Sequence, residues 1–117
     1  MKCIGVDIIE IHRIQQAINR WGESFLHRIY TESELRLCRK NPGRLSSRFA
    51  GKEAVMKALG TGTIGIGWKE IEIVAETGGK PKLQLYGKAL EKAKSSGLTL
   101  AISLSHSKEY AIAFVSS

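Results

Sequence analysis

The segment Leu45–Leu59 reads LSSRFAGKEAVMKAL, and it determines how the rest of the chain is arranged. It is rich in alanine and in other residues that favour helices, and Gly60 follows it where a C-terminal helix cap is expected. We therefore predict one long α-helix over 45–59. Phe49, Glu53 and Lys57 recur every four residues, so they lie along one face of this helix.

Shorter elements are expected on both sides of this helix. Alternating apolar residues predict strands, a period of three to four predicts helices, and clusters of Gly, Pro and Asn predict turns. The expected strands are 1–8, 69–76, 82–86, 98–104 and 110–115, the expected helices are 11–21, 24–29, 31–39 and 87–96, and 41–43 and 60–67 are expected to be a turn and a loop. Early helices packed on a mostly antiparallel sheet make an α+β fold, and we expect residues 1–117 to form a single domain.

The composition is typical of a globular protein without a membrane anchor. Hydrophobic residues make up 43% of the 117 residues, but no run of 18 or more apolar residues exists to cross a bilayer. The two cysteines, Cys3 and Cys38, lack the spacing of a zinc site or a disulfide framework. Free thiols are typical of the reducing cytoplasm, which is the expected location.

Positive charge is concentrated in the first half of the chain. Eighteen Lys and Arg residues against eleven Asp and Glu give a formal net charge of +7. All seven arginines lie in that half: Arg13, Arg20, Arg28, Arg36, Arg39, Arg44 and Arg48. A solvated basic face explains this pattern, and so does a basic nucleic-acid-binding module. The second interpretation is the weaker, because Trp21, Phe49 and Trp68 are scattered and do not indicate a base-stacking platform.

Two stretches match catalytic or cofactor motifs only superficially. Gly60–Gly65 reads GTGTIG, but a dinucleotide-binding loop follows a strand, whereas this one follows a helix. Ser103–Ser107 reads SLSHS, but no Gly-x-Ser-x-Gly elbow accompanies it, so a serine hydrolase is not favoured. The simplest interpretations are a helix cap with its loop and a histidine in a turn.

The acidic residues Asp7 and Glu53 are more informative. Asp7 is the only aspartate of the chain and interrupts an apolar strand, whereas Glu53 lies on the long helix. Two carboxylates from separate elements suit magnesium, which proteins hold with one or two carboxylates, waters and substrate phosphates. Lys57, one turn beyond Glu53, then faces those phosphates. An ion pair between Asp7 and a lysine explains the same residues, so both interpretations stay open.

Three stretches together resemble a known family: GVDIIEIHRI (5–14), RFAGKEAVMKALGTG (48–62) and SLSHSKEYA (103–111). They are similar to the holo-[acyl-carrier-protein] synthases, which are small bacterial 4'-phosphopantetheinyl transferases. The most specific part of the resemblance is Phe-x-x-Lys-Glu-Ala-x-x-Lys at 49–57, combined with the upstream Gly-x-Asp that ends at Asp7.

The resemblance implies a transferase that moves 4'-phosphopantetheine from coenzyme A to a serine of apo acyl carrier protein in fatty acid biosynthesis, releasing adenosine 3',5'-bisphosphate. It implies Mg2+ held by Asp7 and Glu53, with Lys57 contacting phosphate and protonating the leaving group. The proton acceptor for the serine is then either Glu53 or a metal-bound water. Members of the family form trimers with a site at each subunit junction, so a homotrimer is expected.

The resemblance also implies two binding surfaces. The residues expected to contact coenzyme A are Arg39, Lys40, Arg44, Arg48, Lys57, Gly60, Thr61 and His106. The residues expected to contact the acidic carrier protein are Arg13, Arg20, Arg28 and Phe49. Gly22 and Glu23 stand where family members often carry basic residues, and this departure limits the expected extent of the carrier surface.

Overall fold

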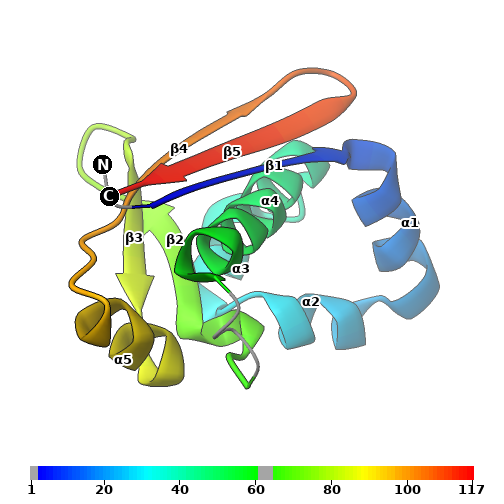
Figure 1. The fold of residues 1–117 in the computed structure, drawn as a ribbon. Coiled ribbons are helices and arrows are strands. Elements are labelled where there is room, and N and C mark those ends of the chain that lie inside the picture. The colour runs from blue at the N-terminus through cyan, green and yellow to red at the C-terminus, as the bar shows by residue number, and fades with distance from the viewer. Residues whose placement is uncertain (1–2, 61–64) are drawn as a thin grey trace.

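A computed structural model describes residues 3–60 and 65–117 and shows an α+β fold (Figure 1). In chain order the elements are β1 (Ile4–Glu10), α1 (Ile11–Trp21), α2 (Glu23–Ile29), α3 (Glu32–Cys38), α4 (Pro42–Leu59), the short 3-10 helix η2 (Trp68–Glu70), β2 (Ile71–Ala75), β3 (Pro81–Leu85), α5 (Gly87–Ser95), β4 (Ala101–His106) and β5 (Tyr110–Ser116). The predicted fold class is therefore confirmed. Thr61, a residue expected to contact coenzyme A, lies outside the described residues.

The strands form two antiparallel groups. β1, β5 and β4 form a three-stranded sheet in that spatial order, and β2 pairs with β3. In Figure 1, α4 runs beneath the three-stranded sheet, with α1 and α2 at one end and α5 at the other. Ile4 pairs with Ser116, which brings the two ends of the chain side by side.

Small residues let the sheet pack closely on α4. A Cβ atom at Gly5 on β1 would overlap the carbonyl oxygen of Ala54 and lie 2.9 Å from the amide nitrogen of Ala58. Ala113 and Val115 of β5 are fully buried in the same core. Because the backbones of strand and helix approach so closely, the polar side chains at neighbouring positions of β1 and α4 can meet.

Helices α1, α2 and α3 contribute to a second core against the first half of α4. Ile14, Leu26, Tyr30 and Leu45 are among its buried members. The hydroxyl of Tyr30 donates a hydrogen bond of 2.8 Å to the carbonyl oxygen of Leu45. This core holds α1 beside the middle of α4, where the candidate site lies.

The structure corrects the predicted start of the long helix. α4 begins at Pro42 rather than at Leu45, so the expected turn at 41–43 is wrong. The side chain of Asn41 accepts a hydrogen bond from the amide of Arg44 at 3.0 Å, and proline at the first helical position lacks an N–H that would need a partner. The Asn-Pro pair is thus a helix start rather than a break.

Two predicted strands are also shorter than expected. Residues 69–76 divide into η2 and β2, and β4 begins at Ala101 rather than at residue 98. The amide of Leu98 instead bonds to the carbonyl oxygen of Ala93 and so belongs to the end of α5. Among the residues that the structure describes, no helix is long and apolar enough to cross a membrane.

Candidate active site

Asp7, Glu53 and Lys57 come together where β1 crosses α4. Alternation along β1 turns Gly5 and Asp7 toward the helix, while the intervening residues face solvent. The ammonium of Lys57 lies 2.9 Å from Asp7 Oδ1 and donates a second hydrogen bond of 3.1 Å to the carbonyl oxygen of Val6. The Asp7 side chain is 14% exposed and that of Lys57 is 55% exposed. The carboxylate is therefore sheltered, while its lysine partner remains open to solvent.

The electrostatics place Glu53 beside the same carboxylate. Burial raises the pKa of Glu53 above its usual value, and the negative charge of Asp7 raises it further. Lys57 and Arg13 act in the opposite direction and lower the pKa of Glu53. The hydrogen bond to Asp7 raises the pKa of Lys57, which keeps the lysine protonated. Two mutually repelling carboxylates thus share a site where extra positive charge is favourable.

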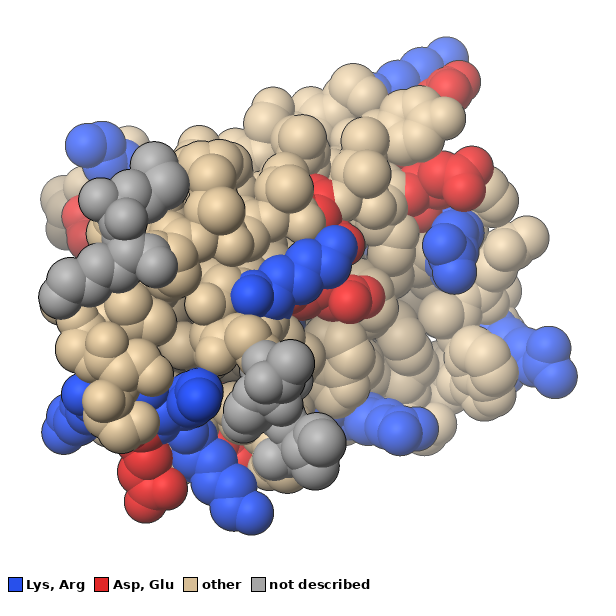
Figure 2. All heavy atoms as spheres, in the orientation of Figure 1, with Lys and Arg blue, Asp and Glu red and all other residues tan. Residues whose placement is uncertain are grey.

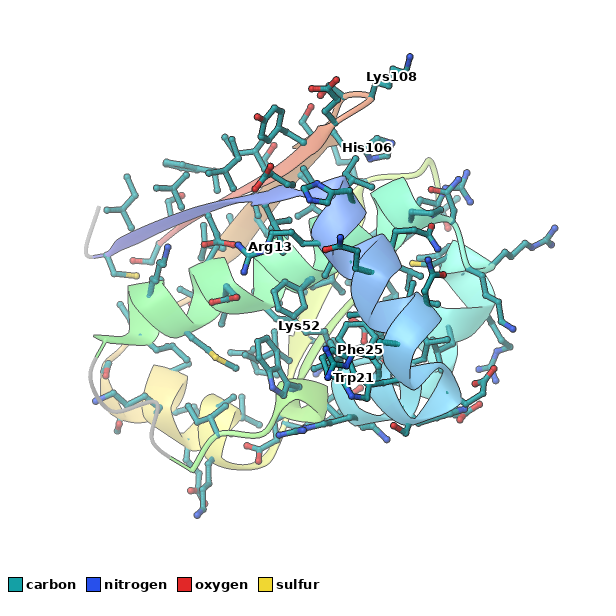
Figure 3. All side chains as sticks on the ribbon, turned by 90° about the vertical axis from the view of Figure 1, so that its right-hand side faces the viewer. Arg13, Trp21, Phe25, Lys52, His106 and Lys108 are labelled. Atoms are coloured by element: carbon teal, nitrogen blue, oxygen red, sulfur yellow. The ribbon has the colours of Figure 1, made fainter. Side chains whose placement is uncertain are left out.

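A pocket of about 350 Å³ opens at these carboxylates, and aromatic rings form its far wall. Asp7, Glu53, Arg13, Trp21 and Phe49 are among its lining residues. Figure 3 shows Arg13 between the level of β1 and the aromatic side chains below it. A second pocket of about 350 Å³ shares the aromatic residues and continues away from the carboxylates.

The second pocket is an aromatic groove, by which we mean the surface of Trp21, Phe25, Arg28, Phe49 and Trp68. The rings of Phe49 and Trp68 are stacked, with centroids 5.0 Å apart. Figure 3 shows Trp21 and Phe25 close together at its edge. The groove therefore combines an apolar aromatic surface with the guanidinium of Arg28, next to the acidic site.

Arginines from the first turns of α4 form a different pocket. Arg44, Arg48 and His106 line it together with Pro81 from the β2–β3 hairpin, and its volume is about 420 Å³. Arg48 Nε donates a hydrogen bond of 3.4 Å to the carbonyl oxygen of Ile73, which anchors its guanidinium at the pocket wall. Two guanidinium groups and an imidazole suit phosphate groups.

Among the described residues, none lines both the arginine pocket and the acidic pocket. Arg48 and Glu53 are five positions apart on α4, which places them about 140° apart around the helix axis. The two pockets therefore lie on different faces of α4 within one chain.

Two basic residues predicted for coenzyme A lie outside the arginine pocket. Arg39 and Lys40 adopt left-handed backbone conformations with φ of 48° and 60°, and they reverse the chain between α3 and α4. The Lys40 ammonium lies 3.4 Å from a carboxylate oxygen of Glu23. Gly60 ends α4 with φ of 84°, as the cap prediction requires.

The comparisons with known proteins agree over nearly the whole chain. The sequence model of the 4'-phosphopantetheinyl transferase superfamily matches residues 3–115. This chain belongs to that superfamily. It is 48% identical to the holo-[acyl-carrier-protein] synthase of Herpetosiphon aurantiacus, covering 98% of this chain and 97% of that protein. It is 50% identical to the corresponding enzyme of Dehalococcoides mccartyi strain CBDB1, covering 95% of this chain and 93% of that protein.

Solved structures of the family show the same fold. The holo-[acyl-carrier-protein] synthase of Helicobacter pylori in complex with coenzyme A superposes with a TM-score of 0.86 at 33% identity, covering 96% of both chains. The synthase of Neisseria meningitidis gives a TM-score of 0.86 at 36% identity, covering 98% of this chain and 96% of that one. The family resemblance seen in the sequence is thereby confirmed.

Several residues that shape this phosphopantetheinyl transferase site were not predicted from the sequence. Trp21, Phe25 and Trp68 were not expected to complete a groove with Phe49, because they come from separate elements. Lys52 was not expected to be buried. The sequence did carry one indication of its burial: Lys52 lies three positions after Phe49 on the same α-helix, so the two side chains are on neighbouring parts of the helix surface.

Proposed function

We propose that this chain transfers the 4'-phosphopantetheine group from coenzyme A to a serine of an apo acyl carrier protein, releasing adenosine 3',5'-bisphosphate. The observation that carries the proposal is the meeting of Asp7, Glu53 and Lys57 beside β1, on a chain of the 4'-phosphopantetheinyl transferase superfamily. The holo-[acyl-carrier-protein] synthase of Helicobacter pylori binds coenzyme A, and its structure matches this chain over 96% of its length.

The donor set fits Mg2+. Among residues 3–60 and 65–117, no group of three His, Cys, Asp or Glu side chains is placed to hold a metal on its own. Asp7 and Glu53 supply two carboxylates, and burial together with the negative charge of Asp7 raises the pKa of Glu53, so a cation between them is stabilised. Magnesium typically combines one or two such carboxylates with substrate phosphates. When bound, it neutralises charge on the pyrophosphate of coenzyme A.

The arginine pocket supports binding of the nucleotide end of coenzyme A. Arg44, Arg48 and His106 provide donors for phosphate, and Pro81 provides an apolar surface. Arg39 and Lys40, also expected to contact coenzyme A, lie beyond this pocket and are more distant candidates.

The bond changes follow from this placement. The carrier serine oxygen forms a bond to the phosphorus of the pantetheine phosphate, and the bond from that phosphorus to the bridging oxygen of the pyrophosphate breaks. The departing bisphosphate keeps the electron pair, and Lys57 stabilises or protonates it. The serine proton passes to Glu53 or to a water molecule at the same site.

The basic and aromatic surface beside the site supports docking of an acidic carrier protein. Arg13 lines the acidic pocket and Arg28 lines the aromatic groove. The guanidinium of Arg20 lies 5.0 Å from the ring centre of Trp21, which ties it to the same surface. Phe49 lines both pockets, so docked carrier would lie against the acidic site.

Assembly as a homotrimer is part of the proposal. The outward face of the three-stranded sheet exposes large apolar residues, with exposures from 40% to 62%: Ile4, Val6, Ile8, Tyr110, Ile112 and Phe114. Figure 2 shows that the surface over β1 and β5 is largely without charge. An exposed apolar patch of this kind is typical of an interface between proteins. In an assembly that buries this apolar patch, the arginine pocket of one copy would bind the phosphates of coenzyme A for the acidic site of another copy.

The residues that the structure describes also fit the expected cytoplasmic location. Cys3 and Cys38 are both free thiols, which a reducing compartment preserves. We also retain the proposal that the chain forms a single domain, because the family model extends from residue 3 to residue 115.

The proposal is tested by incubating the purified protein with apo acyl carrier protein, coenzyme A and Mg2+, then weighing the carrier by intact mass spectrometry. The expected result is a gain of one phosphopantetheine that a chelator prevents. A carrier of unchanged mass, with folded enzyme and several carriers tried, would refute the proposal. A parallel titration with labelled DNA and RNA at physiological salt tests the nucleic-acid alternative.

A further inference from the structure

Lys52 is a fully buried lysine in the middle of α4, next to Glu53. Its ammonium has three hydrogen-bond donors, and all three have acceptors. They are Glu34 Oε1 at 2.7 Å, the carbonyl oxygen of Ile71 at 2.6 Å and the carbonyl oxygen of Trp68 at 3.0 Å. Figure 3 shows Lys52 in the interior of the molecule, below Arg13 and above Phe25. The lysine therefore joins α4 to α3, η2 and the start of β2.

Glu34 is also fully buried, and its other hydrogen bonds fix it in place. Oε1 accepts the amide of Thr31 at 2.8 Å, which completes the capping box at the start of α3. Oε2 accepts the amide of Ile73 at 2.8 Å. Burial lowers the pKa of Lys52, and the adjacent Glu34 carboxylate opposes this shift. The pair is thus a fully satisfied buried ion pair that spans four elements.

A pair of this kind is a costly way to hold a core together. Removing two charges from water carries a desolvation penalty, and apolar residues of similar volume often stabilise a fold at least as well. What the ion pair provides beyond packing is fixed geometry, because three bonds from one ammonium set where three acceptors lie. The acceptor of interest is the Trp68 carbonyl, because the Trp68 ring is stacked on Phe49.

We propose that Lys52 is a positioning residue that holds Trp68 against Phe49 through its bond to the Trp68 carbonyl, and so sets the shape of the aromatic groove. Lys52 lies three positions after Phe49 on α4, so one helix carries both the ring and the ammonium that fixes its partner. η2 contains only Trp68–Glu70, and α2 packs against it. A shift of η2 would open the groove without displacing Asp7 or Glu53.

The consequence for activity rests on the proposed function. If the aromatic groove receives the carrier protein, Lys52 controls recognition of the carrier more than binding of coenzyme A. Glu34 has a different role: its carboxylate neutralises Lys52, whereas the bond to the Trp68 carbonyl comes from Lys52 itself.

The test compares Lys52→Met with three other variants. Lys52→Met keeps an unbranched side chain that is one atom shorter and removes the ammonium. Val115→Ala lowers stability in the other core, away from the groove, and so serves as the control for a general loss of stability. Lys94→Met removes an exposed lysine on α5 and controls for charge. Glu34→Gln removes the negative charge but leaves the Lys52 bond to Trp68 in place.

The first readout is tryptophan fluorescence, which needs no substrate. In a Trp21→Phe background, Trp68 is the only tryptophan, so its emission reports the groove. We expect Lys52→Met to shift the emission to longer wavelength and to raise acrylamide quenching by about twofold or more, since the ring loses its stacking contact with Phe49. Val115→Ala, Lys94→Met and Glu34→Gln should leave the spectrum at the parental position.

The second readout is steady-state kinetics in chains that retain Trp21. We expect Lys52→Met to raise the KM for apo carrier by about tenfold and to change the KM for coenzyme A by less than about twofold. Equal changes in both constants, or a Trp68 spectrum no different from that of Val115→Ala, would overturn the proposal.

The remaining outcomes are also decisive. If Lys52→Met does not fold, the double variant Lys52→Met/Glu34→Gln takes its place, because it removes both charges of the buried pair and leaves neither unpaired. A Trp68 spectrum at the parental position in this double variant would overturn the proposal, and a displaced one would support it. Failure of the parent to modify any carrier would refute the proposed function alone, because the fluorescence readout is independent of turnover.

Discussion

Lys57 Nζ lies 2.9 Å from Asp7 Oδ1, although the two residues are 50 positions apart in the chain. The contact depends on the close packing of β1 on α4, which brings a strand carboxylate to the last turn of a helix. Glu53 lies one turn earlier on the same helix, so the three side chains form one site. The observed ion pair and the proposed magnesium site, which the sequence left as alternatives, therefore involve the same carboxylate.

Removing either carboxylate should abolish metal-dependent turnover. Asp7→Asn and Glu53→Gln keep the size of each side chain, and each is expected to lower Mg2+-stimulated turnover by about 100-fold or more, because the proposed metal loses a charged ligand. Circular dichroism should remain native, and Mn2+ binding followed by electron paramagnetic resonance should weaken. Glu91→Gln on α5 is the matched control. Parental turnover in either site variant would contradict the metal assignment.

The pH dependence of stability should reveal the strain at Glu53. Its pKa is raised in the folded state, so the folded chain holds this proton more tightly than the unfolded chain does. The associated stabilisation is present below the model-peptide pKa of 4.5 and is lost as pH rises through the folded value. In metal-free buffer, Glu53→Gln should therefore gain free energy of unfolding relative to the parent as pH is raised from about 4 to about 7.

Urea unfolding at both pH values measures this difference. Adding Mg2+ at neutral pH should stabilise the parent more than Glu53→Gln, since only the parent retains both carboxylates. A difference between the two proteins that is the same at both pH values would show that Glu53 carries no raised pKa.

Reversing the charge of Arg13 should impair carrier recognition selectively. Arg13→Glu is expected to raise the KM for apo carrier by about tenfold while the KM for coenzyme A changes by less than about twofold, because docking depends on charge complementarity. The parental KM for carrier should rise with added salt, and the variant should lose much of this dependence. Arg36→Glu on α3 makes the same charge change away from both pockets and is the control. Similar kinetics for the two variants would argue against docking at α1.

Much of the fold could be predicted because the signals are local. The alanine-rich segment before Gly60 specifies α4, and the Thr31 capping box with Glu34 specifies the start of α3. The start of α4 was missed because Asn41 and Pro42 are typical both of turns and of helix N-termini, and local sequence does not separate the two.

The site was predictable only where its residues lie on one element or match the family motif. Glu53 and Lys57 share a helix face, and Asp7 was identified as an isolated carboxylate in an apolar strand. The burial of Lys52 and its contact with Trp68 depend on tertiary packing between elements far apart in sequence. Helical periodicity reports a direction around the axis but not which neighbour occupies it.

Gly5 should be intolerant of a side chain. Gly5→Ala is expected to lower the free energy of unfolding by about 2–3 kcal/mol, because its Cβ would overlap the Ala54 carbonyl and separate β1 from α4. Denaturant unfolding measures the loss. Gly67→Ala is the control, since its Cβ would meet only the end of the Glu70 side chain at 3.5 Å, and its stability should change by less than about 1 kcal/mol. Equal stability of the two variants would show that the close approach at β1 is not limiting.

The outward face of the sheet should determine the oligomeric state. Val6 and Phe114 are cross-strand partners, and both are at least 40% exposed, so they form one continuous apolar surface. A charge placed there would be buried without a partner on assembly, which costs several kcal/mol per site. Phe114→Lys is therefore expected to convert the proposed trimer to monomers, as measured by size-exclusion chromatography with light scattering.

If the arginine pocket of one copy acts together with the acidic site of another, the loss of assembly in this variant should also lower its activity. We expect Phe114→Lys to retain native circular dichroism but to raise the KM for coenzyme A by about tenfold or more, because Arg48 and Glu53 lie on different faces of α4 within one chain. Thr99→Lys adds the same charge at an exposed loop position and should leave both mass and kinetics unchanged. A fully active monomer would show that one chain alone contains the complete site.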